Sequence, residues 1–427
     1  MTDVVGSTAF RPAHPSRMVA IEAIAGTAAL LLDNGQTTER TVVAAKRLGG
    51  ALGLSVTVLP RWGELGVHVE GLPFSDVVPT APLGVDMGRV LAIMTVVDQL
   101  CDGKLPIEAA YEASAAAGRL PPASTPRFVL FAAIGAASLG VIFGALDMAS
   151  LLLIALSAGV GAWLRRWLGA RFGNPFVQPL CAALVAGMVG AAAVRLNLSD
   201  AQGLIALCPC MVMVPGPHIL NGAIDLARTR MALGIARLAY AAVIVLVICT
   251  GLLLGLTIGG ASLPATAPAV PVPFGADVVA AGCAVAAFGT FFSMPWRMLP
   301  VPIVIGMLAH AARWALISLA GAHVAIGALA ACLLVGAVIA PIADRVHLPF
   351  AALGFSAVVS MMPGLYLFRA AGALVEVVSI GNHAPPELLQ NVVTNGATAF
   401  LIILAMAFGL ILPRLLLERR HPTPAGR

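Results

Sequence analysis

Long apolar stretches set the pattern of this chain from residue 127 onward, with few polar positions inside each stretch. A run of about 17–25 apolar residues is long enough to cross a bilayer as a helix. The pattern therefore predicts an all-α polytopic membrane protein with about ten transmembrane helices. We expect the spans near residues 128–146, 148–164, 176–194, 203–226, 231–258, 277–294, 299–319, 322–341, 349–375 and 394–413.

Residues 1–127 have a different pattern, in which apolar and polar positions alternate over short distances. Capping residues and helical spacing predict four helices, near residues 17–33, 38–51, 86–101 and 106–119. Two runs with period-two alternation, 54–59 and 65–70, predict a β-hairpin, and a proline-containing loop is expected over 71–83. This N-terminal head is therefore expected to be a small α+β cytoplasmic domain.

The ten expected spans form two sets of five, and one proline–glycine pair interrupts the fourth span of each set. Pro215-Gly216 and Pro363-Gly364 are 148 residues apart (363 − 215), which predicts an internal repeat of five helices. Because five is odd, the second copy enters the membrane from the opposite side, as in the inverted repeats of many secondary transporters. The expected domains are the head and linker (1–127), the first repeat (128–260), the second repeat (277–413) and a cytoplasmic tail (414–427).

Composition and charge agree with this interpretation. Charged residues make up only 11% of the chain, whereas about a quarter of the residues in soluble domains are charged. The net charge of +5 comes from scattered arginines, so no nucleic-acid partner is expected. The arginines fall mainly in alternate loops, such as Arg165, Arg166 and Arg171 after the second span. The positive-inside rule then predicts a multi-pass protein of the cytoplasmic (inner) membrane with both termini in the cytoplasm.

Polar residues near the first break are candidates for substrate binding or coupling, because a charge at membrane depth needs a partner or water. Asp225 either exchanges protons, which would couple transport to a proton gradient, or binds a substrate ammonium group. The alternative for Asp225 is an ion pair with Arg228 or Arg230 at the interface. Asn221 lies one turn earlier on the same helix face. His218 either relays protons or caps backbone groups after the break.

Two arginines lie within the spans, where a charge at the bilayer centre costs about 2.5–3.5 kcal/mol on insertion scales. We expect Arg237 to pair with Asp225. Arg313, three residues after His310, is expected to bind a substrate carboxylate, and snorkelling to the interface is the alternative for both arginines. The complete set of candidate substrate or coupling residues is Pro215, Gly216, His218, Asn221, Asp225, Arg237, His310, Arg313, Pro363, Gly364, Tyr366 and Arg369.

No catalytic, metal or cofactor site is expected from the motifs of the chain. The seven cysteines lie mostly inside apolar spans, and Cys208-Pro209-Cys210 has the wrong spacing for a zinc site or a redox pair. The sequence has no GxxxxGKS/T phosphate loop, no HExxH motif and no GxSxG motif, so a proton gradient is the expected energy source. A membrane-embedded enzyme, or a sensor that uses the head as its output domain, is a more distant alternative.

Three stretches give the chain a family resemblance. They are LLLDNGQTTERTVVAAKRLGGALGL in the head, VPGPHILNGAIDLARTRMALGIARL at the first break and ADRVHLPFAALGFSAVVSMMPGLYLFRA at the second. With these motifs the chain resembles the threonine/serine exporter family over nearly its whole length. The two membrane modules, which are similar to separate subunits in some relatives, are fused here in one chain.

The resemblance implies a secondary-active exporter of small polar metabolites in the lipid bilayer, with threonine and serine as the expected substrates. Some relatives with separate subunits are associated with succinate export, so a dicarboxylate exporter is the alternative. That alternative requires two positive groups facing one cavity, and Arg237 and Arg313 are the candidates. The role of the head and the formation of a homo-oligomer are left open.

Overall fold

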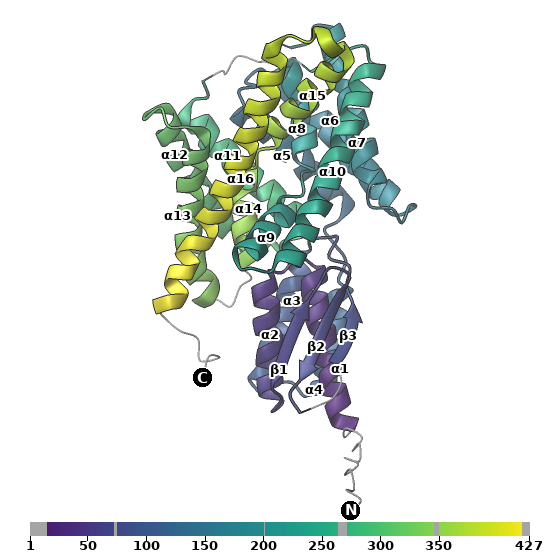
Figure 1. Cartoon of the computed structure of the whole chain (residues 1–427), viewed down its shortest axis with the longest axis vertical. Coiled ribbons are helices and arrows are strands. Elements are labelled where there is room, and N and C mark those ends of the chain that lie inside the picture. The colour runs from purple at the N-terminus through teal and green to yellow at the C-terminus, as the bar shows by residue number, and fades with distance from the viewer. Residues whose placement is uncertain (1–14, 72–74, 200, 264–270, 346–349, 421–427) are drawn as a thin grey trace, which may run out of the picture. The chain divides into compact units, whose positions relative to one another are not determined.

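The computed structural model describes residues 15–71, 75–199, 201–263, 271–345 and 350–420, which form two compact units (Figure 1). The first unit contains the chain up to Asn34, then Thr38–Pro82 and Arg89–Leu120. The second contains Gly35–Thr37, Leu83–Gly88 and the chain from Pro121 onward. Two short segments of the expected head therefore belong to the membrane unit.

The first unit packs helices against a small antiparallel sheet with the strand order β1-β2-β3. Its elements are α1 (Pro15–Asp33), α2 (Thr38–Ala51), β1 (Val56–Pro60), β2 (Glu64–Val69), β3 (Ser75–Pro79), α3 (Met87–Cys101) and α4 (Ile107–Gly118). Alternate residues of β2, Leu65, Val67 and Val69, are buried in one core with Ile24 and Leu31 of α1. The predicted helices and hairpin are present, which confirms the period-two pattern.

The loop expected over residues 71–83 is wrong in one part, because it contains the third strand, β3. This strand pairs with the free edge of β2, where Val67 lies opposite Asp76. Its composition hid it, since Ser75, Asp76 and Pro79 are typical of turns and not of strand interiors. Such residues are tolerated at the edge of a sheet, where one side of the strand has no partner and proline costs little.

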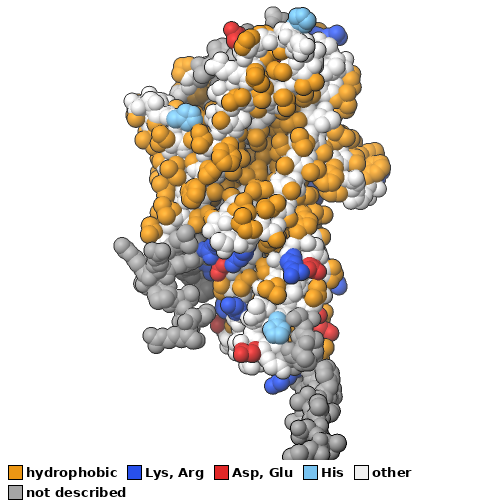
Figure 2. Space-filling model, in the orientation of Figure 1, with side chains coloured by type: hydrophobic (Ala, Val, Ile, Leu, Met, Phe, Trp, Pro, Cys, Tyr) orange, Lys and Arg blue, Asp and Glu red, His pale blue; other side chains and the backbone are white. Residues whose placement is uncertain are grey.

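The second unit consists of helices with hydrophobic side chains over much of its visible surface (Figure 2). The first set of elements is α5 (Thr125–Ile142), α6 (Met148–Gly169), α7 (Val177–Arg195), α8 (Gln202–Met211), α9 (Gly216–Ala227) and α10 (Met231–Ile258). The second set is α11 (Phe274–Phe291), η1 (Trp296–Met298), α12 (Pro300–Ser318), α13 (Val324–Arg345), α14 (Phe350–Val358), η2 (Val359–Met361), α15 (Gly364–Ile380), η3 (Gly381–His383) and α16 (Pro386–Arg420).

Among the described residues, nine helices are long and apolar enough to cross a membrane, and there are ten if the bent pair α8–α9 counts as one span. Exposed side chains such as Leu152 and Leu156, which are more than 60% accessible, would face lipid. The chain is therefore a multi-pass, all-α membrane protein, as the apolar pattern predicted. One boundary differs with consequence for the site: α6 continues to Gly169, so Arg165 and Arg166 lie on a helix and not in a loop.

The helices of the second set pack in the same order as those of the first. In the first set α7 packs along α10, and α6 contacts both α5 and α7. In the second set α13 packs along α16, and α12 contacts both α11 and α13. The two first helices, α5 and α11, pack against each other. This matched packing agrees with the five-helix repeat read from the sequence.

Candidate functional site

The first break lies where α8 ends and α9 begins, and the two helices are bent by 60°. Pro209 lies within α8, and Pro215 and Pro217 surround Gly216 at the start of α9. Proline removes a backbone donor and clashes with the preceding turn, so the helix cannot continue through this stretch. At the second break the 3-10 turn η2 follows α14, and Pro363 lies between η2 and α15. Both predicted breaks are therefore present.

The two breaks touch each other, and glycine is needed on both sides of the contact. A Cβ atom on Gly216 would lie 2.9 Å from Cγ2 of Val359, and one on Gly364 would lie 2.9 Å from Cγ of Met211. The two contacts exchange under the repeat, since 364 − 216 and 359 − 211 are both 148. Reciprocal contacts of this kind are the mark of a two-fold relation. These contacts agree with the pseudo-two-fold relation expected for the two repeats.

A cavity of about 600 Å³ lies beside the first break. Its wall includes the break itself, the C-terminal end of α6, the start of α7, part of α10, the end of α11 and the segment 83–86. The polar side chains in the wall are Asp86, Arg165, Arg166, Gln178, His218, Tyr240 and Ser293. Of the residues predicted as functional, Pro215 and His218 line this cavity. Ligand sites of about 300–1,000 Å³ with a few polar groups are typical of small-molecule binding.

Arg165 is the charged group of this cavity with the fewest polar partners. Its buried Nε atom has no hydrogen-bond partner, and no described residue accepts a hydrogen bond from its guanidinium group. The group lies over the ring of Phe291, 5.0 Å from its centroid, and beside the cation of Arg166. A buried cation without a counter-charge is unfavourable. An anionic ligand group in the cavity would satisfy it.

The neighbouring polar groups are more fully engaged. Arg166 donates a hydrogen bond to the carbonyl oxygen of Ala123 at 2.9 Å and interacts electrostatically with Asp86. The Tyr240 hydroxyl donates to the carbonyl oxygen of Leu83 at 3.4 Å, and its ring lies 5.1 Å from that of His218. With one acid against two arginines, the side chains of this wall carry a net charge near +1.

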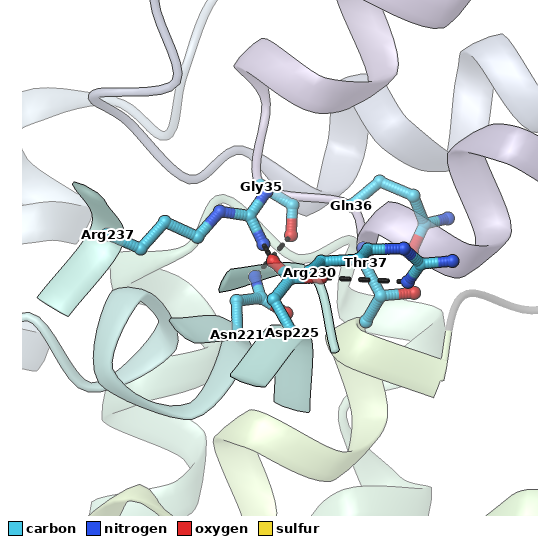
Figure 3. Close-up of polar contacts among 7 residues, drawn as sticks. All are labelled: Gly35, Gln36, Thr37, Asn221, Asp225, Arg230 and Arg237. Atoms are coloured by element: carbon cyan, nitrogen blue, oxygen red, sulfur yellow. Dashed lines mark hydrogen bonds and ion pairs between the residues drawn. The ribbon is translucent and has the colours of Figure 1, made fainter. Parts of the chain in front are cut away.

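Asp225, Asn221 and Arg237 gather at a second place, away from the cavity wall (Figure 3). The Asp225 carboxylate accepts a hydrogen bond from Nη1 of Arg237 at 2.9 Å, and Nη1 of Arg230 lies 3.6 Å from its other oxygen. Asn221 donates a long hydrogen bond of 3.4 Å to the carbonyl oxygen of Gly35. The predicted pair of Asp225 and Arg237 is confirmed, and so is the contact of Asp225 with Arg230.

This cluster is buried inside the second unit. Asp225 and Arg237 are 1% and 2% exposed. The segment Gly35–Thr37 belongs to the same unit, and Gln36 and Thr37 within it are also buried. The Asp225 carboxylate faces two arginine side chains inside the helical unit. In this state Asp225 therefore stabilises the packing around α9 and does not present a carboxylate to the cavity.

His310 is hydrogen-bonded on both ring nitrogens in the second repeat. Nδ1 lies 3.3 Å from a carboxylate oxygen of Asp277, and Nε2 lies 3.0 Å from the hydroxyl oxygen of Ser360, which directly precedes the second break. Arg313 interacts electrostatically with Asp277 and Tyr366, and Arg369 with Tyr366. The structure thus brings His310, Arg313 and Tyr366 to the second break, and neither Arg313 nor Arg237 lines the cavity beside the first break.

Most polar residues of these sites were missing from the sequence prediction, among them Asp277, Ser360, Arg165 and Asp86. The repeat itself contained a signal for Arg165, because Arg313 occupies the equivalent position (313 − 165 = 148). Tyr366 likewise corresponds to His218 (366 − 218 = 148). Asp277 could have been noticed as an acid at the start of a span. Ser360 had no signal in the sequence, since serine is common in membrane helices.

Two family models match the chain. The model described as "Putative threonine/serine exporter" matches residues 22–259, which include most of the described head and nearly all of the first set of membrane helices. The model described as "Threonine/Serine exporter, ThrE" matches residues 277–416, the second set. No solved structure matches the chain.

Proposed function

Because the chain belongs to the threonine/serine exporter family, we propose that it exports threonine, serine or a similar small polar amino acid across the cytoplasmic membrane. Transport proceeds by alternating access, with the two repeats moving against each other at their breaks. The observation that carries the proposal is the guanidinium group of Arg165 in the cavity beside the first break, whose buried Nε atom has no hydrogen-bond partner.

The chemistry of the cavity wall suits an amino acid. Arg165 binds the substrate carboxylate, since a guanidinium–carboxylate contact is a strong, charge-assisted hydrogen bond. Asp86, on the segment 83–86, is the acidic group of the wall and attracts the substrate ammonium group. Gln178 and His218 offer hydrogen bonds to a side-chain hydroxyl such as that of threonine or serine. A zwitterion therefore finds a counter-charge for each of its charged ends.

A dicarboxylate such as succinate is the second candidate, and one observation favours it: Arg165 and Arg166 line the same cavity. Asp86 opposes it, because it offsets one of the two positive charges and repels a second carboxylate. The pair expected for this alternative, Arg237 and Arg313, is not available, since neither lines the cavity.

The position of the cavity suits loading from the cytoplasm. Its wall includes Arg165 and Arg166, in the arginine-rich end of α6 that the positive-inside rule assigns to the cytoplasmic side. The state described here is then inward-facing, with substrate entering beside the first break. A proton gradient across the same membrane supplies the energy.

Efflux from proteoliposomes tests this function. Vesicles with the full-length chain are loaded with labelled threonine, serine or succinate, and efflux is compared for wild type, Arg165→Gln and the control Arg171→Gln. Loss of one charge-assisted hydrogen bond of about 1.5–3 kcal/mol weakens threonine binding about tenfold to a hundredfold. We therefore expect a raised KM for threonine in Arg165→Gln.

Arg171 is exposed beyond the end of α6 and stacks on Trp167, so its replacement removes the same charge from outside the cavity. We expect its KM to stay at the wild-type value. A wild-type KM in Arg165→Gln would contradict the assignment of the cavity. Movement of succinate without threonine or serine would contradict the substrate class.

A further inference from the structure

His310 lies at the centre of a buried chain of three side chains from three different elements. Asp277 comes from α11, His310 from α12 and Ser360 from η2. The exposed fractions are 2%, 0% and 2%. Ionisable groups so deep in an apolar helical unit are costly, and their presence indicates a function.

The order serine–histidine–aspartate is also that of hydrolytic triads, but the surroundings do not fit hydrolysis. An attacking serine needs an open approach for its substrate and donors for the oxyanion. Ser360 is buried, and none of the three residues lines the 600 Å³ cavity. The arrangement instead fits the binding and release of a proton.

The roles of the three groups depend on the tautomer of His310, and we assign it from the hydrogen-bond chemistry of its partners. The Asp277 carboxylate can only accept, so Nδ1 of His310 carries a hydrogen and donates it. In the neutral ring Nε2 is then an acceptor, and the Ser360 hydroxyl donates to it. Nε2 is therefore the atom that is free to take up a further proton.

We propose that His310, oriented by Asp277, is the proton-binding site through which the gradient drives transport. We also propose that Ser360 transmits the protonation state of His310 to the second break. Uptake of a proton forms an N–H bond at Nε2 and converts the imidazole to imidazolium. Ser360 then changes from donor to acceptor, and its own hydrogen must find another partner. Release breaks the same N–H bond and restores the first arrangement. The proposal rests on the transport function above and adds its coupling site.

The charges around His310 make the proton state sensitive to conformation. The groups that act on it electrostatically are Asp277 from α11 and Arg313 on α12 itself. The neighbouring elements α13, over residues 324–343, and α14 contain no charged residue. Asp277 and Arg313 balance each other, so the added proton leaves a net charge of +1. Such a charge is costly in an apolar interior and acceptable when the site is open to water.

The same site has no counterpart in the first repeat. The positions equivalent to Asp277, His310 and Ser360, which are 148 residues earlier, are Val129, Ala162 and Val212. Arg313 and Arg165, in contrast, are equivalent. The repeats therefore share an arginine beside each break, whereas the proton-binding pair belongs to the second repeat alone.

Two transport assays on the full-length chain in proteoliposomes test the proposal. The first is efflux of labelled threonine with an inward proton gradient, and the second is exchange of internal for external threonine at equal pH. For His310→Gln we expect efflux to run at the same rate with and without the gradient, while exchange, which needs no net proton movement, continues. The control His323→Gln changes an exposed histidine in a loop and should behave as wild type in both assays.

Acceleration of His310→Gln by the gradient to the wild-type extent would overturn the proposal. Loss of both efflux and exchange in protein that is monodisperse on size exclusion would overturn it as well, because His310 would then support the fold or the substrate. If His310→Gln does not fold, the same two assays on Ser360→Ala test the proposal, because this variant keeps the His310–Asp277 pair. We expect it to lose the acceleration and keep exchange, and unchanged acceleration would refute the role of Ser360.

The wild-type protein separates this proposal from the transport function. Exchange without acceleration by the gradient would overturn the proton site and leave the exporter assignment intact. No movement of threonine, serine or succinate in either assay would overturn the exporter assignment itself.

Discussion

Replacing Asp225 by leucine would leave Arg237 as a cation inside the helical unit. Asp225 is 1% exposed and Arg237 2% exposed, and 2.9 Å separates Nη1 of Arg237 from the carboxylate. Arg230, at 3.6 Å from the other carboxylate oxygen, has a side chain that is 27% exposed. It can therefore turn toward water when Asp225 is lost, whereas Arg237 cannot.

The size of the effect follows from burial. Removing one partner of a buried ion pair costs about 3–5 kcal/mol, because the remaining charge has no partner. We expect a loss of this size in the free energy of unfolding for Asp225→Leu and for Arg237→Met. Replacing both partners by apolar residues is about neutral or stabilising, so the double variant Asp225→Leu/Arg237→Met should lie close to wild type. For Arg230→Met, a partly exposed pair, we expect a loss of about 1 kcal/mol or less.

Unfolding in mixed micelles of a mild detergent and SDS, followed by circular dichroism, measures these free energies. The four proteins of the double-mutant cycle give the coupling between the two side chains directly. If the two single losses simply add in the double variant, the ion pair contributes nothing and the reasoning from burial is wrong. If the double variant is as stable as wild type but does not exchange threonine, Asp225 has a role in transport besides its role in packing.

Two further predictions concern the contacts of the repeat and a helix cap. Gly216→Ala should lower the free energy of unfolding by about 1–3 kcal/mol, because the added methyl group overpacks against Val359, whose side chain is stiff at χ1. Gly364→Ala should lower it by less, because the Met211 side chain can adapt. Equal losses in the same unfolding assay would contradict this prediction. Asp147 caps α6 by accepting from the backbone N–H of Ser150 at 2.8 Å, so Asp147→Ala should cost about 1 kcal/mol. Burial raises the pKa of Asp147, but hydrogen bonds from Ser150 and Ser199 outweigh it and lower the pKa overall. The difference from Asp147→Ala should therefore be fully present at neutral pH, begin to fall below about pH 4, the unfolded value, and be lost as the pH drops through the lower folded pKa. A difference that grows on acidification would refute the cap.

The large features of the fold could be predicted because they depend on local sequence. Long apolar runs define the spans, and Pro215-Gly216 and Pro363-Gly364 define the breaks, since no regular helix accommodates those pairs. The ion pair of Asp225 and Arg237 was also predictable, because two buried opposite charges only 12 residues apart have few other partners. The strand β3 was not, because its polar residues gain stability from pairing with β2 and not from their own preference.

The site could be predicted only in part, because its contacts join distant segments. His310 was identified as a candidate, but its partners Asp277 and Ser360 are 33 and 50 residues away along the chain. Arg165 was assigned to a loop because the apolar run stops at residue 164, although the helix continues to Gly169. Helix ends are set by capping and tertiary contacts, which a hydrophobic pattern does not record.

The reciprocal glycine contact has a mechanical consequence. With no side chains at Gly216 and Gly364, the two breaks approach each other closely, within a wider contact between the repeats that includes α5 packed against α11, and this close approach can act as a fulcrum. The helix α6 has 22 residues, which at 1.5 Å per residue is about 33 Å, or about 16 Å from centre to end. If the repeats rotate by about 10°, the helix ends move by about 3 Å, roughly the diameter of a water molecule, while the atoms at the fulcrum hardly move. A lever of this geometry can open one mouth and close the other without breaking the packing at its centre.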